Sequence, residues 1–482
     1  MNGNEAMEDV TVVEEEEKSS EKTVYMWGYL PGASSEKAPI LSPTAVRLTD
    51  SCFAGDSWKD VCGGGCGFAV AISEKGKLVT WGSTDDENQS YLMSGKHGEI
   101  PGHYKLPTEA SVVKAAAGWA HCASVTEDGD VYLWGWKECV PSGKVFTDLI
   151  TVGSLQKDVA GKQSSSVAEQ GSPQSPNTSS GSDSHHDNKK VVEEAGKRRK
   201  ISFAKQESDS QASGDELFIV SPSLVTLGHG VKITSVAVGG RHTLALSDVG
   251  QVWGWGYGGE GQLGLGSRVK MVSSPHLISC IESASGKDKS SFQQGSTALQ
   301  CSNVAGNYVT EIACGGRHSA VITDTGALLT FGWGLHGQCG QGNNADQLRP
   351  TLVPSLLGTR VKQIAAGLWH TLCVTANGQL YAFGGNQFGQ LGTGNDQTET
   401  SPKLLDTFEN NLSSIVSCGA RHSALLTDDG HLFTWGWNKY GQLGLGDSVD
   451  RNIPSRVSIS GCRPRNVACG WWHTLLMADK PV

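Results

Sequence analysis

Residues 415–446 read IVSCGARHSALLTDDGHLFTWGWNKYGQLGLG, and this stretch decides the fold. An apolar strand leads into a Gly-x-x-His step at Gly419–His422, and a second apolar strand ends at Asp429-Gly430. A third strand ends in Trp435-Gly436 and is followed by a glycine-rich turn. Because a two-residue turn needs positive φ, Asp-Gly between two apolar runs predicts a β-hairpin.

The same pattern recurs along the chain with a period of about 52 residues. Equivalent histidines stand at His121, His242, His318, His370, His422 and His473, and Phe68 takes their place in the earliest copy. An aromatic residue followed by glycine comes thirteen residues after Phe68 and after each of the first five histidines, at Trp81, Trp134, Trp255, Phe331, Phe383 and Trp435. Such a period is typical of all-β arrays that contain one supersecondary unit per repeat.

The two ends of the chain predict how the array is completed. The copy at His473 has no Trp-Gly after it, whereas an unmatched Trp27-Gly28 stands near the beginning. Each histidine half of the repeat has an aromatic-Gly half only if the strand that begins at His473 pairs with the strand that ends at Trp27-Gly28. Because circular closure removes exposed sheet edges, we expect an all-β fold. The expected fold is a seven-bladed β-propeller closed by pairing of its N- and C-terminal strands.

The repeat resembles that of the regulator of chromosome condensation family, which has Gly-x-x-His, an alternating apolar strand, Trp-Gly and then Gly-Gln-Leu-Gly. The last element stands at 261–264, 389–392 and 441–444, with the variant Gly-Gln-Cys-Gly at 337–340. The resemblance covers residues 24–136 and 223–482 and implies a propeller. The Trp-Asp signature of the other common propeller family is absent from the sequence.

The remaining segments predict the domain organisation. Residues 1–23 include the acidic run Glu14–Glu17 and are expected to form a disordered tail. Residues 24–136 and 223–482 form the two parts of the propeller. Residues 137–222 are expected to be a disordered Ser-rich insert with a basic cluster, and a minor loop insert is expected at about 281–303.

The larger insert contains the sharpest linear motif. The basic cluster Lys197, Arg198, Arg199 and Lys200 predicts a nuclear localisation signal, with a plain solvated charge run as the alternative. Ser172 and Ser175, each followed by proline, and Ser202 beside the basic cluster are candidate phosphorylation sites. A phosphate at Ser202 would offset part of the basic charge. These features favour a location in the nucleus.

Composition limits the function classes. The formal net charge is −10, which argues against nucleic-acid binding over the whole surface and favours basic protein partners. Direct DNA contact through one local basic patch stays open. Thirteen Cys, no signal peptide and no long apolar run favour reduced core thiols and no membrane partner.

The sequence predicts no catalytic, cofactor or metal residues. A histidine that recurs once per blade is interpreted as a buried, hydrogen-bonded strand residue, because a catalytic group is needed only once. Gly254, Gly256 and Gly259 match Gly-x-Gly-x-x-Gly, but no helix is predicted after them, so nucleotide binding is not expected. No nucleophile–base motif stands apart from the repeat, and we expect a non-enzyme.

The resemblance then implies several function classes. The first is a nuclear chromatin-associated platform that binds histones or chromatin regulators through a propeller face and regulates gene expression. The alternative is a guanine-nucleotide exchange factor for a Ran-type small GTPase, and a scaffold for ubiquitin ligases is also open. Ultraviolet-B sensing, as in a plant member of the family, is disfavoured, because Trp119 and Trp471 stand in blades separated by the Phe68 blade. Trp136, Trp333 and Trp437 either pack between blades or anchor partner peptides.

Overall fold

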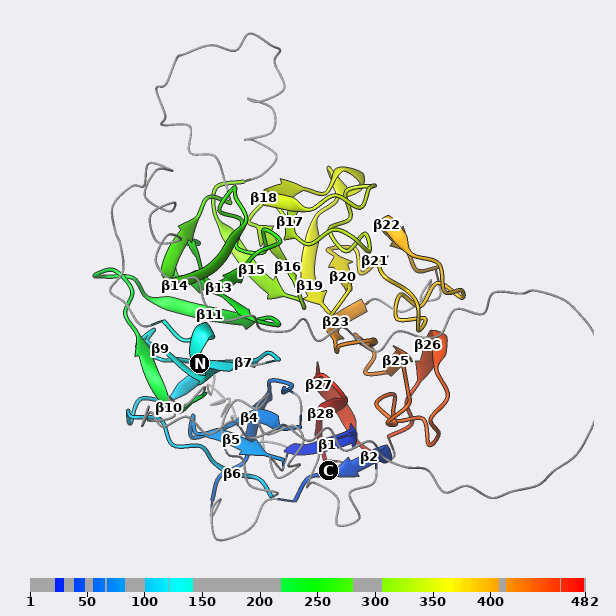
Figure 1. Ribbon diagram of the computed structural model, residues 1–482. Helices are drawn as coiled ribbons and strands as arrows, with labels where there is room; N and C mark the ends of the chain where they lie inside the picture. The colour runs from blue at the N-terminus through cyan, green and yellow to red at the C-terminus, as the bar shows by residue number, and fades with distance from the viewer. Residues whose placement is uncertain are drawn as a thin grey trace, which may run out of the picture. The chain divides into compact units, whose positions relative to one another are not determined.

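The predicted all-β, seven-bladed propeller is confirmed. The computed structural model describes residues 22–29, 39–47, 55–65, 67–82, 100–119, 121–141, 218–280, 306–406, 413–459 and 461–480. Seven four-stranded antiparallel sheets follow one another around a ring (Figure 1). Each blade contacts the next through its innermost strands.

One blade contains strands from both ends of the chain. Its sheet order is β2(Ile40–Ala45), β1(Lys22–Gly28), β28(His473–Asp479), β27(Arg463–Cys469). In the antiparallel pairing of β1 with β28, Tyr25 lies opposite Leu476 and Gly28 opposite His473. The strands therefore pair in the way that the orphan Trp27-Gly28 predicted, and this pairing completes the ring.

The other six blades follow the chain order. Their strands are β3(Trp58–Val61), β4(Ala69–Ser73), β5(Leu78–Trp81) and β6(Gly102–His103); β7(Val112–Ala117), β8(His121–Thr126), β9(Val131–Trp136) and β10(Phe218–Val225); β11(Ile233–Val238), β12(His242–Ser247), β13(Val252–Gly258) and β14(Val269–Ile278); β15(Val309–Cys314), β16(His318–Thr323), β17(Leu328–Gly332) and β18(Gln347–Leu352); β19(Val361–Ala366), β20(His370–Thr375), β21(Leu380–Gly384) and β22(Glu399–Leu404); and β23(Ser413–Cys418), β24(His422–Thr427), β25(Leu432–Gly436) and β26(Arg451–Arg456). Two short 3-10 turns, η2(Lys137–Cys139) and η3(Pro354–Leu356), join strands.

Two segment boundaries differ from the sequence-based expectation. Strand β10 begins at Phe218, inside the range 137–222 that was expected to be insert, and Phe218 pairs with Trp136 of β9. Strand β1 begins at Lys22, inside the expected tail 1–23. Strand pairing extends each boundary, because these residues satisfy backbone groups of a neighbouring strand. The centre of the large insert, the minor insert at about 281–303 and the start of the tail lie outside the described residues.

The repeated histidines join neighbouring blades. All six are fully buried, and five place Nε2 at 2.6–3.1 Å from a hydroxyl of the next blade. The Thr474 hydroxyl donates its hydrogen to the Gln442 carbonyl at 2.8 Å, so it accepts from His422 Nε2–H at 2.9 Å. This arrangement fixes the Nε2–H tautomer. His473 lacks such a partner, because Ala69 stands where the next blade would need a hydroxyl.

The Gly-Gln-Leu-Gly turns also contact the next blade. The Gln442 carbonyl also accepts a hydrogen bond from Trp27 Nε1 at 2.9 Å, and the Gln390 carbonyl does so from Trp435 Nε1 at 2.9 Å. Both tryptophans are fully buried in the next blade. Gly444 (φ +71°) packs directly on Trp27, and a Cβ there would lie 2.7 Å from its Nε1. The motif is therefore a joint between blades, which explains why it recurs with the period of the fold.

Candidate protein-interaction faces

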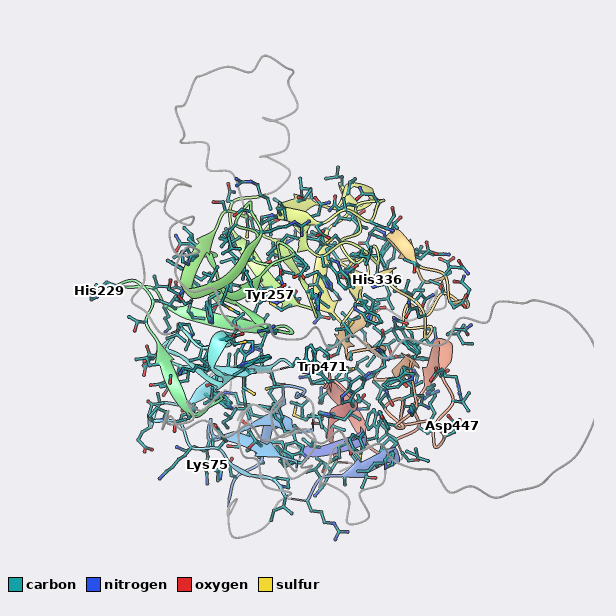
Figure 2. All side chains as sticks on the ribbon, viewed as in Figure 1. Lys75, His229, Tyr257, His336, Asp447 and Trp471 are labelled. Atoms are coloured by element: carbon teal, nitrogen blue, oxygen red, sulfur yellow. The ribbon has the colours of Figure 1, made fainter. Side chains whose placement is uncertain are left out.

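One end of the strands presents a continuous arc of aromatic and arginine side chains, here called the aromatic–arginine belt. Its members come from six of the seven blades; Tyr257, His336 and Trp471 are labelled in Figure 2. The belt consists of Trp136, Arg241, Tyr257, Arg317, Trp333, His336, Trp369, Phe388, Arg421, Trp437, Tyr440, Tyr29, Trp472, Trp471 and Trp119.

Two repeat positions build most of the belt. The first is the residue before the histidine, and the second directly follows the aromatic-Gly pair of the third strand. The two are joined by a backbone hydrogen bond in blade after blade, as in Trp333 N–H to Arg317 O (2.9 Å) and Trp437 N–H to Arg421 O (2.9 Å). Because the backbone fixes both positions, a large side chain at either one is held at the same end of the ring. Trp136, Trp333 and Trp437 are only half-buried there, so they both pack on the belt and face solvent.

The arginines lie over aromatic rings. The Arg421 guanidinium carbon is 5.1 Å from the Trp369 ring centre, 4.8 Å from that of Phe388 and 5.3 Å from that of Trp437. Burial among these rings lowers the Arg421 pKa from its usual value. Arg241 and Arg317 each pair with a carboxylate, Glu138 and Glu260 respectively. Such stacking holds the guanidinium in place and leaves its remaining N–H donors available for a partner.

The expectation that Trp119 and Trp471 are kept apart is wrong. Their ring centres are 5.6 Å apart, and Trp472 lies 6.5 Å from Trp471. In the intervening blade the corresponding loop includes Gly63, Gly64 and Gly65, which carry no side chain. The same position holds Gly240, Gly316, Leu368 and Ala420 in four other blades, so only these two blades contribute a tryptophan there.

The opposite end of the strands has a different character, and we call it the hairpin face. Six turns join the second strand of a blade to its third, at residues 74–77, 127–130, 248–251, 324–327, 376–379 and 428–431. They contain two lysines, Lys75 and Lys77, and eight carboxylates: Glu74, Glu127, Asp128, Asp130, Asp248, Asp324, Asp428 and Asp429. The formal charge of the six turns is therefore 2 − 8 = −6.

Several of these carboxylates are unpaired. Asp128, Asp130, Asp248 and Asp428 are exposed and form no ion pair with any residue that the structure describes. The exposed Glu109 contacts Lys77 of the first turn at 3.7 Å. The densest group, Glu127, Asp128 and Asp130, belongs to a single turn. The six turns by themselves are thus acidic and favour cationic partners, and Lys232, Arg360 and Arg463 from adjoining loops pack against three of them.

The buried titratable groups belong to the packed interior of the propeller, and burial shifts their pKa values. Burial lowers the pKa of five ring histidines to about 3 and that of His473 to about 4, so all six are neutral at physiological pH. Burial also raises the pKa of Glu311 to about 7; this carboxylate accepts the Ile364 N–H of the next blade at 3.3 Å. Within the described ranges, no group of three or more His, Cys, Asp or Glu residues is placed to hold a metal ion.

Some predicted sites lie outside the described residues. These are the basic cluster Lys197, Arg198, Arg199 and Lys200 and the candidate phosphoacceptors Ser172, Ser175 and Ser202. A search of the described part of the chain for a helix long and apolar enough to cross a membrane found none.

Closed rings of this repeat, with hydrogen-bonded joints between the blades, define a class of repeat propellers. The sequence model of the RCC1-like domain matches residues 196–481, and the chain belongs to this family.

Relatives and solved structures agree with this assignment. The chain is 33% identical over 268 residues to the ultraviolet-B receptor UVR8 of Arabidopsis thaliana, covering 55% of this chain and 56% of UVR8. It is 34% identical over 252 residues to the human E3 ubiquitin-protein ligase HERC2, covering 52% of this chain and 5% of HERC2. The chain thus spans only about half of UVR8 and a small part of HERC2.

Two solved structures share the fold over 96% of this chain. Human WBSCR16 matches with a TM-score of 0.65 at 21% identity, over 100% of its chain. Prp20p from Saccharomyces cerevisiae, described with its binding to Gsp1p and histones, matches with a TM-score of 0.64 at 17% identity, over 93% of its chain. Identities this low show the common fold alone.

Proposed function

We propose that this protein is a nuclear, chromatin-associated interaction platform that binds histones through the hairpin face and thereby regulates gene expression. The observation that carries the proposal is the charge of the six hairpin turns, which is −6 and includes carboxylates without cationic partners. Histones are strongly basic, so a surface of this sign attracts them and accelerates encounter.

Two further observations support the same partner class. The formal net charge of the whole chain is −10, which disfavours binding to the DNA phosphates of chromatin over most of the surface. Prp20p, which has the same fold, is described as binding histones. The predicted nuclear signal at Lys197–Lys200 fits a partner that resides in the nucleus.

The test measures binding of purified core histones to the intact chain. The variant Glu127→Gln/Asp128→Asn/Asp130→Asn removes three charges from one turn without removing a buried group. We expect its Kd for the histone H3–H4 complex to rise by about tenfold, with a weaker dependence on salt. The matched control Glu138→Gln/Asp396→Asn/Glu399→Gln removes three charges away from the hairpin face and should leave Kd within about twofold. Equal Kd values for the wild type and the hairpin variant would refute the proposed face.

The second candidate is nucleotide exchange on a Ran-type small GTPase. The observation that favours it is the aromatic–arginine belt, because an exchange factor acts through a large contact surface rather than through catalytic residues. Release of labelled GDP from such a GTPase, with and without the chain, tests this function. Acceleration that is abolished by Arg421→Ala and Trp437→Ala would support it, and unchanged release would eliminate it.

The nuclear location has its own test. Replacing Lys197, Arg198, Arg199 and Lys200 by alanine in the full chain should move a fluorescent fusion out of the nucleus. Replacing the exposed Lys59, Lys105, Lys362 and Lys439 by alanine instead is the control, and nuclear retention of the first variant would contradict the signal.

A further inference from the structure

A cavity of about 200 Å³ lies at one edge of the aromatic–arginine belt, between η2 and strands β13 and β14. It is lined by Lys137, Glu138, Val140, Arg241, Tyr257, Lys270, Met271 and Ser273. This volume is too small for a drug-sized ligand and suits one compact charged group with its attachment. Nothing in the histone proposal uses it.

The lining is strongly cationic. Lys137, Lys270 and Arg241 contribute three positive charges and Glu138 one negative charge, so the formal balance is 3 − 1 = +2. Both lysines are exposed, and neither forms an ion pair with another residue in the described ranges. In a chain of net charge −10, such a concave cationic site stands out from its surroundings.

Two aromatic rings and one carboxylate hold the Arg241 side chain in place in the cavity. Its guanidinium lies 4.3 Å from the Trp136 ring centre and 5.4 Å from that of Tyr257, and Nη2 pairs with Glu138. Its Nε is buried and has no hydrogen-bond partner among the described residues. A planar guanidinium flanked by two lysine ammonium groups matches a group with several anionic oxygens, such as a phosphate.

We infer that this cavity is a phosphate-binding site for a phosphorylated serine, and that Ser172 and Ser175 of the chain's own insert supply that group. The insert begins beside the cavity: Val140 lines it, and the described chain stops at Pro141. The chain resumes at Phe218, opposite Trp136, whose ring supports Arg241. Both ends of the insert are thus held next to the site.

The linker length permits the contact. About 30 residues separate Pro141 from Ser172, and a reference random-coil chain of that length spans roughly 30 Å on average. Tethering at this range gives the serines a high effective concentration at the site. A phosphate on serine adds a charge of about −1.5 to −2 and three acceptor oxygens, which neutralises the +2 balance of the cavity.

A phosphopeptide fits better than a nucleic acid backbone. The cavity has room for one phosphate, and Glu138 in its lining and Glu260 beside Tyr257 would repel the further phosphates of a strand. Val140, Met271 and the Tyr257 ring provide apolar contact for a peptide beside the phosphate.

The first arm of the test uses a peptide in trans. A fluorescent peptide of residues 168–180, phosphorylated on Ser172 and Ser175, is titrated with unphosphorylated full-length chain and followed by anisotropy. We expect the phosphopeptide to bind at least about tenfold more tightly than the unphosphorylated peptide, and Lys137→Gln/Lys270→Gln to remove this preference. Lys439→Gln, an exposed lysine of the same face beside Tyr440, is the matched control and should bind like the wild type.

The second arm tests the source of the phosphate. Full-length chain phosphorylated by a proline-directed kinase should bind the added phosphopeptide at least about tenfold more weakly than unphosphorylated chain, and S172A/S175A chain treated identically should bind it fully. Unchanged affinity after phosphorylation would overturn the assignment to the insert. Equal binding of both peptides, or of the wild type and the double lysine variant, would overturn the site itself. Tighter binding of a single-stranded oligonucleotide that depends on the same lysines would overturn the phosphoserine assignment.

Discussion

The buried ring of histidines predicts that the propeller loses stability in mild acid. Burial holds the pKa of His121, His242, His318, His370 and His422 near 3, and that of His473 near 4, against about 6.5 in an unfolded chain. The pKa of each histidine is lower in the folded chain than in the unfolded chain. Below pH 6.5 the unfolded chain therefore binds protons that the folded chain does not bind. The free energy of unfolding therefore falls as pH drops from 6.5 toward 3.

The magnitude follows from the number of groups. Each histidine contributes a slope of about 1.4 kcal/mol per pH unit below pH 6.5. At pH 5.5 the six together remove about 8 kcal/mol, which is comparable with the roughly 5–15 kcal/mol that stabilises an ordinary folded domain. We expect guanidinium or thermal unfolding, followed by circular dichroism, to show a steep loss of stability between pH 6.5 and 5.

A single variant isolates the cause. His473→Phe reproduces the residue that Phe68 places in the neighbouring blade, and it removes the one histidine that lacks a hydroxyl partner. The variant should fold at pH 7.5 and show a pH slope smaller by about 1.4 kcal/mol per unit. Equal stability of the wild-type chain at pH 7.5 and pH 5.5 would refute the reasoning.

Two other predictions concern the joints between blades. Glu311→Gln should stabilise the fold by about 1–3 kcal/mol at pH 8 and by little at pH 5, because burial raises the pKa of this carboxyl to about 7 and an amide avoids the cost of its ionisation. Gln363 already makes the equivalent contact in the next blade. An unchanged denaturation midpoint at pH 8 would contradict this prediction. Thr474→Val should cost about 2–4 kcal/mol in denaturant unfolding, because it leaves both His422 Nε2 and the Gln442 carbonyl without the shared hydroxyl. A loss below about 0.5 kcal/mol would show that the contact is dispensable.

The sequence was sufficient to predict features that repeat. The histidine step and the aromatic-Gly pair recur because each blade makes the same joint to the next, so their spacing reports the fold directly. The closing pair β1 and β28 could be predicted for the same reason, because the counts of the two half-motifs match only in a ring.

Features that depend on several blades at once could not be predicted. Trp119 and Trp471 are distant in sequence and belong to blades that do not follow one another along the chain, yet their ring centres lie 5.6 Å apart. Strand β10 was missed at its start because no Gly-Gln-Leu-Gly turn precedes it, so nothing local marks Phe218. The cavity around Arg241 combines η2 with two later strands, and its lysines follow no repeat position.

Zero-length coupling of carboxylates to lysines in a mixture of the full chain and core histones tests the proposed function most directly. Mass spectrometry of the products should locate the crosslinks at Glu127, Asp128 and Asp130 of the hairpin face. Crosslinks confined to Glu138 and Glu260 at the other end of the ring, or no crosslinks to histones, would contradict a histone platform built on the hairpin face.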